Sequence, residues 1–144
     1  MKVYIGADHA GFELKEKLKT YLNKNYNLID LGNTKYDKND DYPKFASKVA
    51  KKVSKSKSFG ILICGSGQGV CIAANKIKGI RAVLAEHIKD SKMARLDDDA
   101  NVLCLQGRLL SFNKAKKICD TFLQTEFTNF KRHLRRINEI KKLE

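Results

Sequence analysis

The sequence lacks any apolar run long enough to cross a membrane, and it contains no tryptophan and a single proline. A membrane-spanning helix needs about 20 consecutive apolar residues. The chain also begins directly with an alternating strand pattern, rather than with the basic segment and long apolar segment of a secretory signal peptide. These absences predict a cytoplasmic protein with no membrane partner.

Cysteine and histidine are too few and too scattered to indicate a zinc site or a disulfide framework. Only three histidines accompany the four cysteines, which show no C-x-x-C spacing and lie in apolar stretches: Cys64, Cys71, Cys104 and Cys119. Reduced thiols are therefore expected. The sequence predicts no metal site.

Acidic residues are scarce beside basic ones, since 16 Asp and Glu against 29 Lys and Arg leave a net charge of +13. Much of this charge falls in two clusters, at residues 44–57 and 131–142. Nucleic-acid binding would suit the charge, but no helix-turn-helix, zinc finger or aromatic-interleaved basic strand is present to read bases. Anionic small molecules are the better-supported partners, and no nucleic-acid partner is expected.

What the chain does contain is a regular alternation of strand-like runs and amphipathic helical stretches. Its length suits one domain, residues 1–144. Strands are expected at residues 2–7, 28–31, 59–64, 80–85 and 101–105. Helices are expected between and after them, the second running to about residue 57, another capped by Ser111, and a last one carrying Phe127, Phe130, Leu134 and Ile137. This order predicts an α/β fold, a Rossmann-like three-layer sandwich with a five-stranded parallel sheet and helices on both faces.

The most informative stretch is residues 59–75, FGILICGSGQGVCIAAN. An apolar run of strand length stops at alternating glycines and is followed by helical spacing, which predicts a strand, an anion-sized loop and a helix. A thiol at such a helix start, here Cys64, ionises more readily than a free cysteine and can serve as a base or nucleophile. The hydroxyl of Ser66 stands two residues away. The alternative is a buried structural cysteine in an ordinary strand-to-helix turn.

Two familiar nucleotide-binding loops do not fit this stretch. The G-x-G-x-x-G fingerprint would need glycine at Val70, and no Gly-Lys-Ser/Thr of a P-loop occurs. In parallel sheets, ligands bind at the carboxyl ends of the strands. The residues expected there are Asp8 and His9, Cys64 to Gly69, Glu86 and His87, and Gln106 to Arg108. They favour chemistry on a phosphorylated compound beside a thiol.

Six motifs are spread in order along nearly the whole chain: IGADHAGFELK at 5–15, DYP at 41–43, ICGSGQG at 63–69, AANKIKGIRA at 73–82, ANVL at 100–103 and R-H-x-x-R at 132–136. Together they resemble the type B ribose-5-phosphate isomerases, a family that also includes galactose-6-phosphate isomerase. The resemblance implies an enzyme that interconverts ribose 5-phosphate and ribulose 5-phosphate, in the non-oxidative pentose phosphate pathway, without a metal or an organic cofactor.

The resemblance also implies roles for individual residues. Cys64 would be the base that moves a proton between C2 and C1, and the Ser66 hydroxyl would relay protons between O1 and O2. Asp8 and His9 would contact the sugar hydroxyls, ring oxygen or phosphate. Backbone N–H groups of the glycine loop would hold the enediolate oxygens: Gly65, Gly67, Gln68 and Gly69.

For the phosphate, the resemblance implies Arg108, Arg132 and Arg136. Arg132 and Arg136 are four residues apart, so they project from one face of the last helix and can reach one anion together. The alternative for this pair is ordinary surface charge. In relatives the last helix reaches a partner subunit, so a shared site in a homodimer, or in a tetramer, is implied.

One departure concerns Asp97 and Asp98, which stand where the family often has His-Asn. That histidine opens the sugar ring in some relatives. A carboxylate with an ordinary pKa of about 3.9 is a poor proton donor at neutral pH, so ring opening is expected mainly from Asp8 and His9, with Asp97 as a catalytic base or hydrogen-bond acceptor and Asp98 in substrate binding.

Gln68 is a second departure, because that position is often apolar in relatives. Both departures leave alternatives open for the function. One is isomerisation of a hexose 6-phosphate of the galactose or allose type, and another is a non-catalytic sugar-phosphate or nucleic-acid binder. The presence of Cys64 and Ser66 favours the enzyme, because a binding protein needs no base.

Overall fold

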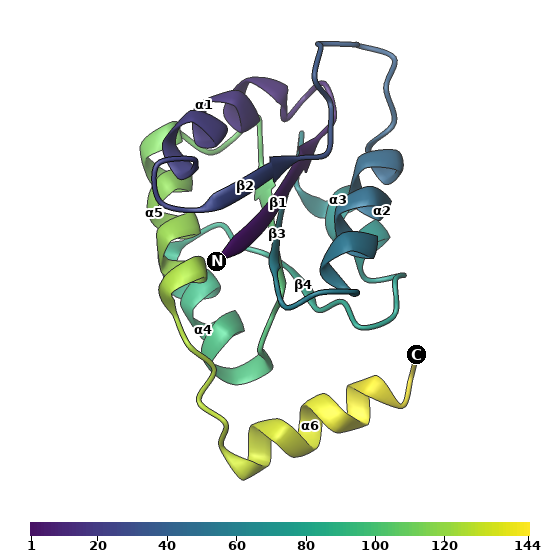
Figure 1. The fold of residues 1–144 in the computed structure, drawn as a ribbon, viewed down its shortest axis with the longest axis vertical. Helices are drawn as coiled ribbons and strands as arrows, with labels where there is room; N and C mark the ends of the chain where they lie inside the picture. The colour runs from purple at the N-terminus through teal and green to yellow at the C-terminus, as the bar shows by residue number, and fades with distance from the viewer.

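A computed structural model describes all 144 residues, which form one sheet flanked by helices (Figure 1). The strands are β1 (Lys2–Ala7), β2 (Asn27–Asp30), β3 (Phe59–Cys64), β4 (Ala82–Leu84) and β5 (Val102–Gln106). The helices are α1 (Phe12–Leu22), α2 (Tyr42–Val53), α3 (Gln68–Ala74), α4 (Ile88–Asp98), α5 (Phe112–Gln124) and α6 (Lys131–Lys141). No helix has both the length and the apolar character needed to span a bilayer.

All five strands are parallel, in the order β2-β1-β3-β5-β4. The register pairs Ala7 with Ile63 and Cys64 with Gln106. The carboxyl ends of β1, β3 and β5 therefore meet at one edge of the sheet. The chain order reverses direction between β1 and β3, the kind of position where parallel sheets leave a crevice for ligands.

Two apolar clusters lie on the two faces of the sheet. One joins α1, α4 and α5 to inward side chains such as Ile5 and Leu103. The other joins α2 and α3 to the opposite side chains of the same strands, including Leu62 and Cys64. Figure 1 shows α1, α4 and α5 on one side of the strands and α2 and α3 on the other. The predicted three-layer α/β sandwich is confirmed.

Several boundaries differ from those the sequence predicts. α2 ends at Val53 rather than near residue 57, and β4 is only three residues long. The last helix begins after Phe130, which caps it in an extended conformation, and Asn129 before it has a left-handed φ of 55°. Phe127 and Phe130 therefore belong to the connection and not to the helix. Ser111 caps α5 as predicted, its Oγ accepting a hydrogen bond of 3.3 Å from the Lys114 N–H.

Helix α6 leaves the sandwich and lies at the end of the molecule where the strands begin (Figure 1). It buries His133 and Ile137, and the His133 Nδ1 lies 3.0 Å from the Thr128 hydroxyl. Its C-terminal end is tied to the turn before β4 by a 2.8 Å hydrogen bond from the Gly79 N–H to Glu144. Leu134 and Ile140 remain partly exposed on α6, so one chain covers only part of its apolar surface.

Candidate active site

A pocket of about 390 Å³ lies at the carboxyl ends of β1, β3 and β5. Its lining comes from the turns after these strands and from α2 and α3. The lining residues are Asp8, His9, Ala10, Tyr42, Cys64, Gly65, Ser66, Gln68, Gly69, Ile72 and Arg108. Eight of the residues predicted for the site are among them, so the register of the sheet brings together side chains that lie as far as 100 residues apart.

Cys64 is the last residue of β3 and is 4% exposed at the bottom of this pocket. The turn that follows is shaped by Gly67, which caps α3 with a φ of 74°. A Cβ on Gly67 would meet the Leu105 backbone at 3.0 Å, so this glycine packs beneath the loop rather than facing the pocket. The Ser66 Oγ accepts a hydrogen bond of 3.4 Å from the Gln68 N–H. A thiol and a hydroxyl therefore share one wall.

Asp8 and His9 follow β1, the strand next to β3, and line the same pocket. Asp8 is buried, which raises the pKa of its carboxyl above the ordinary value although a hydrogen bond of 3.1 Å from the Gly11 N–H opposes the shift. The imidazole Nδ1 of His9 lies 2.8 Å from Asp40, in the loop between β2 and α2. A carboxyl group with a raised pKa and an oriented imidazole thus lie in the same pocket as a thiol, which is typical of acid–base sites.

Arg108 supplies the positive charge of the pocket. It follows β5, and its backbone N–H donates to the Gly65 carbonyl at 3.2 Å. Its guanidinium lies against the glycine loop, because a Cβ on Gly65 would be 3.1 Å from the Arg108 Cζ. An anionic group bound here would meet a guanidinium capable of paired hydrogen bonds.

The other predicted site residues lie outside this pocket. Asp97 and Asp98 end α4 at the opposite edge of the sheet, where the Asp98 carbonyl accepts a hydrogen bond of 2.9 Å from Arg81, just before β4. Arg132 and Arg136 are exposed on α6, and the Arg132 guanidinium stacks 4.9 Å from the Phe130 ring centroid. A single chain therefore does not bring these four residues to Cys64.

Sequence reasoning missed four contributors to this region. Ala10, Tyr42 and Ile72 line the pocket, and the Tyr42 ring lies where a Cβ on Gly69 would approach within 2.6 Å. Tyr42 belongs to the DYP motif, but the motif alone indicates no contact. Asp40 is one of several aspartates in a polar loop, and nothing in its spacing distinguishes it from Asp37.

The same turn contains a group with the ligand types of a metal site. One ligand atom each from Asp8, His9 and Asp40 lies within 4.8 Å of the others. The short contact between His9 and Asp40 already satisfies these two side chains as a hydrogen-bonded pair. Asp8 accepts its own hydrogen bond from the Gly11 N–H, so none of the three side chains needs an ion to satisfy it.

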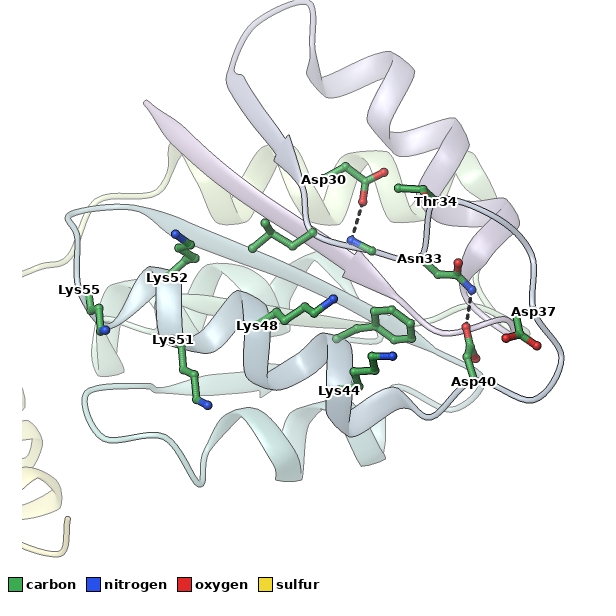
Figure 2. Close-up of a pocket in the computed structure, with 13 residues that line it drawn as sticks. Asp30, Asn33, Thr34, Asp37, Asp40, Lys44, Lys48, Lys51, Lys52 and Lys55 are labelled. Carbon is green, nitrogen blue, oxygen red and sulfur yellow. Dashed lines mark hydrogen bonds between the residues drawn. The ribbon is translucent and has the colours of Figure 1, made fainter.

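A larger cavity, of about 770 Å³, lies on the other side of the β2–α2 loop (Figure 2). Leu31 and Phe45 are the only hydrophobic residues that line it, and lysines on or just after α2 also contribute: Lys44, Lys48, Lys51, Lys52 and Lys55. No thiol and no histidine lines it. The reactive side chains are all in the smaller pocket, which is why we identify that pocket as the candidate active site.

Residues 3–140 match a family described as Ribose/Galactose Isomerase. The chain belongs to this family. The predicted family is thus confirmed, and so is the expectation that the protein is an enzyme.

Two curated relatives in the family illustrate the similarity. The probable ribose-5-phosphate isomerase B of Mycoplasma genitalium is 48% identical over 141 residues, which cover 96% of this chain and 92% of that protein. Ribose-5-phosphate isomerase B of Mycobacterium tuberculosis is 40% identical over 140 residues, covering 96% and 86%. The match therefore extends over nearly the full length of both proteins.

Solved structures of family members have the same fold. The Mycoplasma genitalium ribose-5-phosphate isomerase B with bound ribulose 5-phosphate superposes with a TM-score of 0.94 at 46% identity, covering 99% of this chain and 95% of that one. The type B ribose 5-phosphate isomerase of Trypanosoma brucei superposes with a TM-score of 0.95 at 40% identity, covering 99% of this chain and 98% of that one.

Proposed function

We propose that this protein is an aldose–ketose isomerase that interconverts ribose 5-phosphate and ribulose 5-phosphate in the non-oxidative pentose phosphate pathway. The observation that carries the proposal is the pocket in which Cys64, Ser66 and Arg108 converge, in a fold shared with a 46% identical enzyme that binds ribulose 5-phosphate. Residues 1–144 act as one isomerase domain in this proposal.

The central step is a proton transfer between C2 and C1 of the open-chain sugar. The Cys64 thiolate takes the C2 proton, and the C2–H electron pair forms the C1–C2 double bond while O1 takes up the negative charge. Ser66 passes the O2 proton to O1, and the Cys64 thiol returns its proton to C1 as the carbonyl forms at C2. Backbone N–H groups of the loop 65–69 stabilise the intermediate charge. The position of Cys64 in the pocket wall, at the end of β3 and just before the glycine loop, supports this role.

The sugar ring must open before this step. Asp8 and His9 flank the pocket and contact the sugar, and His9 transfers the proton between the anomeric hydroxyl and the ring oxygen. An imidazole suits this step because its ordinary pKa of about 6.5 lets it accept and donate a proton near neutral pH.

The phosphate is bound by Arg108 together with Arg132 and Arg136 from a second copy of the chain. The distance of α6 from the pocket of its own chain supports a shared site, and so does its partly exposed apolar surface. The protein is then a homodimer, or a tetramer built from such dimers. In the same assembly, Asp97 and Asp98 also come from the partner chain.

A hexose 6-phosphate is the second candidate substrate, because the matching family includes galactose isomerases. The reaction at C1 and C2 would be the same, and only the distance to the phosphate would change. A non-catalytic sugar-phosphate or nucleic-acid binder is the third possibility and would have no use for the thiol.

The deciding experiment measures formation of ribulose 5-phosphate from ribose 5-phosphate by the purified protein in the presence of EDTA. Turnover is expected, and it should exceed turnover of galactose 6-phosphate or allose 6-phosphate under the same conditions. No isomerisation of any of these sugars would exclude the proposed activity. Loss of activity with EDTA that a divalent ion restores would contradict the expected metal independence.

A further inference from the structure

Asp40 makes more contacts with the site than its position in a polar loop indicates. It lies 31 residues from His9, and its side chain is 8% exposed. Its Oδ1 accepts a hydrogen bond of 2.9 Å from the His9 backbone N–H and lies 2.8 Å from the Nδ1 of the His9 ring.

Asn33 holds the other carboxylate oxygen. Its side-chain amide donates to the Asp40 Oδ2, as the dashed line in Figure 2 shows. The Asn33 Oδ1 in turn accepts a 3.0 Å hydrogen bond from the Lys35 N–H, which fixes the orientation of the amide. Both oxygens of the Asp40 carboxylate are thus in contact, Oδ1 with His9 and Oδ2 with Asn33, which orients Oδ1 toward His9.

We propose that Asp40 is a positioning residue that fixes the tautomer and the orientation of His9. An ionised carboxylate can only accept hydrogen bonds, so a neutral imidazole beside it must carry its proton on Nδ1. The lone pair is then on Nε2, the only ring nitrogen left for a ligand in the pocket. The arrangement resembles the role of an aspartate beside a catalytic histidine in hydrolases. The inference rests on the proposed function.

The proton balance of ring opening shows why this tautomer matters. Nε2 takes the proton of the anomeric O1–H, and the O1 electrons form the C1 carbonyl as the bond between C1 and the ring oxygen O4 breaks. O4 then takes the same proton from Nε2, so no external acid or base is consumed. Asp40 remains ionised throughout and stabilises the transient imidazolium. With the proton on Nε2 instead, the first transfer could not take place.

The surroundings of His9 contain no competing partner for Nδ1. The Tyr36 ring lies edge-on to the imidazole with centroids 6.4 Å apart. Asp8, next in sequence, directs its Oδ1 to the Gly11 N–H instead. Asp40 is therefore the group that decides which ring nitrogen faces the pocket.

The test compares two nearly isosteric substitutions in the same loop. Asp40→Asn keeps the shape but removes the charge, and kcat with ribose 5-phosphate is expected to fall on the order of 10²-fold, the lower end for a positioned acid–base group. KM should stay within about a factor of two and kcat with the open-chain ribulose 5-phosphate within about threefold, since ring opening is bypassed. Asp37→Asn, whose side chain contacts only the nearby Asn39 N–H at 3.0 Å, should behave as wild type.

Nitrogen-15 NMR of the His9 ring, assigned with a His9→Asn variant, provides a readout that activity does not. The neutral ring of the wild type should carry its proton on Nδ1, and Asp40→Asn should shift the population toward Nε2–H. Asn33→Ala removes the hydrogen bond to only one oxygen of Asp40, so it should change kcat with ribose 5-phosphate and the tautomer population of His9 less than Asp40→Asn does. If Asp40→Asn does not fold, the tautomer of His9 in the wild type and the kinetics of Asn33→Ala still test whether Asp40 fixes the proton on Nδ1.

Four outcomes would overturn the inference. They are a wild-type His9 protonated on Nε2, unchanged kcat for Asp40→Asn, an equal loss with both substrates, or an EDTA-sensitive activity restored by a divalent ion, which would make Asp40 a metal ligand. Failure of the proposed function gives a different pattern. The wild type would then isomerise neither pentose phosphate, while the NMR spectrum would still show which nitrogen of His9 is protonated beside Asp40.

Discussion

At the scale of single residues, the four cysteines differ in their burial and in whether they line the pocket. Cys104 and Cys119 are fully buried, and burial raises the pKa of both thiols. Cys71 lies on α3 outside the pocket, with its thiol 3.4 Å from the Ala82 carbonyl. Only Cys64 lines the pocket, which is why Cys64 is the cysteine that we propose as the base.

Replacing Cys64 by Ser should lower turnover of ribose 5-phosphate by roughly 10²- to 10⁴-fold with little change in KM, because a serine hydroxyl is a far weaker acid than a thiol and cannot serve as the base. Steady-state kinetics measure both quantities. Cys71→Ser provides the matched control and should retain most of its activity. Near-normal turnover by Cys64→Ser would mean that another group is the base.

Substitutions of Asp97 and of His9 are expected to lower the isomerisation rate by different amounts. Asp97→Asn should be nearly silent with ribulose 5-phosphate, whereas His9→Ala should lose far more in both directions, because contacts to the sugar ring and phosphate disappear together. Initial rates from each pentose phosphate separate the two cases. An Asp97→Asn protein that fails with ribose 5-phosphate but works from the open-chain side would instead identify Asp97 as the ring-opening group.

At the scale of elements, two lysines of α1 form largely buried ion pairs with Asp30 at the end of β2. Lys15 is fully buried, with its Nζ 2.6 Å from both Asp30 and Glu16, and Lys19 lies 3.0 Å from Asp30. Burial would raise the pKa of Asp30, but hydrogen bonds from Lys15, Gly32 and Lys19 outweigh it and hold the pKa below its ordinary value.

Asp30→Asn should therefore lower the free energy of unfolding by about 1.5–3 kcal/mol near neutral pH, the cost of a lost hydrogen bond between charged groups. Because the pKa of Asp30 is lower in the folded state, its stabilisation is complete above about pH 4 and is lost as the pH falls through the folded value. Urea unfolding between about pH 7 and pH 3 should show the difference from wild type shrinking. A difference that stays constant with pH would contradict this assignment.

At the scale of the whole molecule, the proposed site combines the pocket of one chain with Arg132 and Arg136 on α6 of a second copy. Arg132→Ala and Arg136→Ala should each weaken binding of ribulose 5-phosphate by about 1.5–3 kcal/mol, the range for a charge-assisted contact. Arg135→Ala changes the same helix at a side chain that pairs with Glu139 at 3.9 Å, and it should have little effect. Titration calorimetry with catalytically inactive Cys64→Ala backgrounds gives these affinities directly.

Mixing Cys64→Ala with Arg132→Ala tests the shared site in the same system. If each site uses two chains, a heterodimer has one intact site, and equal mixing should recover up to roughly a quarter of the wild-type sites. The measurement is activity against time, alongside an independent measure of subunit exchange. Exchange without any recovered activity would count against a composite site.

The sequence by itself determined the layers of the fold and one wall of the site. Short apolar runs specify β1, β3 and β5, because parallel strands that are covered on both faces are apolar along most of their length. The glycines after Cys64 likewise specify the turn into α3, since the left-handed φ at Gly67 excludes most other residues. Local physics therefore suffices for these features.

Only the tertiary structure decided which distant side chains meet. Asp40 and His9 are joined because the β2–α2 loop folds over the end of β1, while the sequence offers several equivalent aspartates. Asp97 lies at the opposite edge from Cys64 because α4 runs back across the sheet after β4. Strand order and loop path set these distances, and neither is encoded in the spacing of residues along one element.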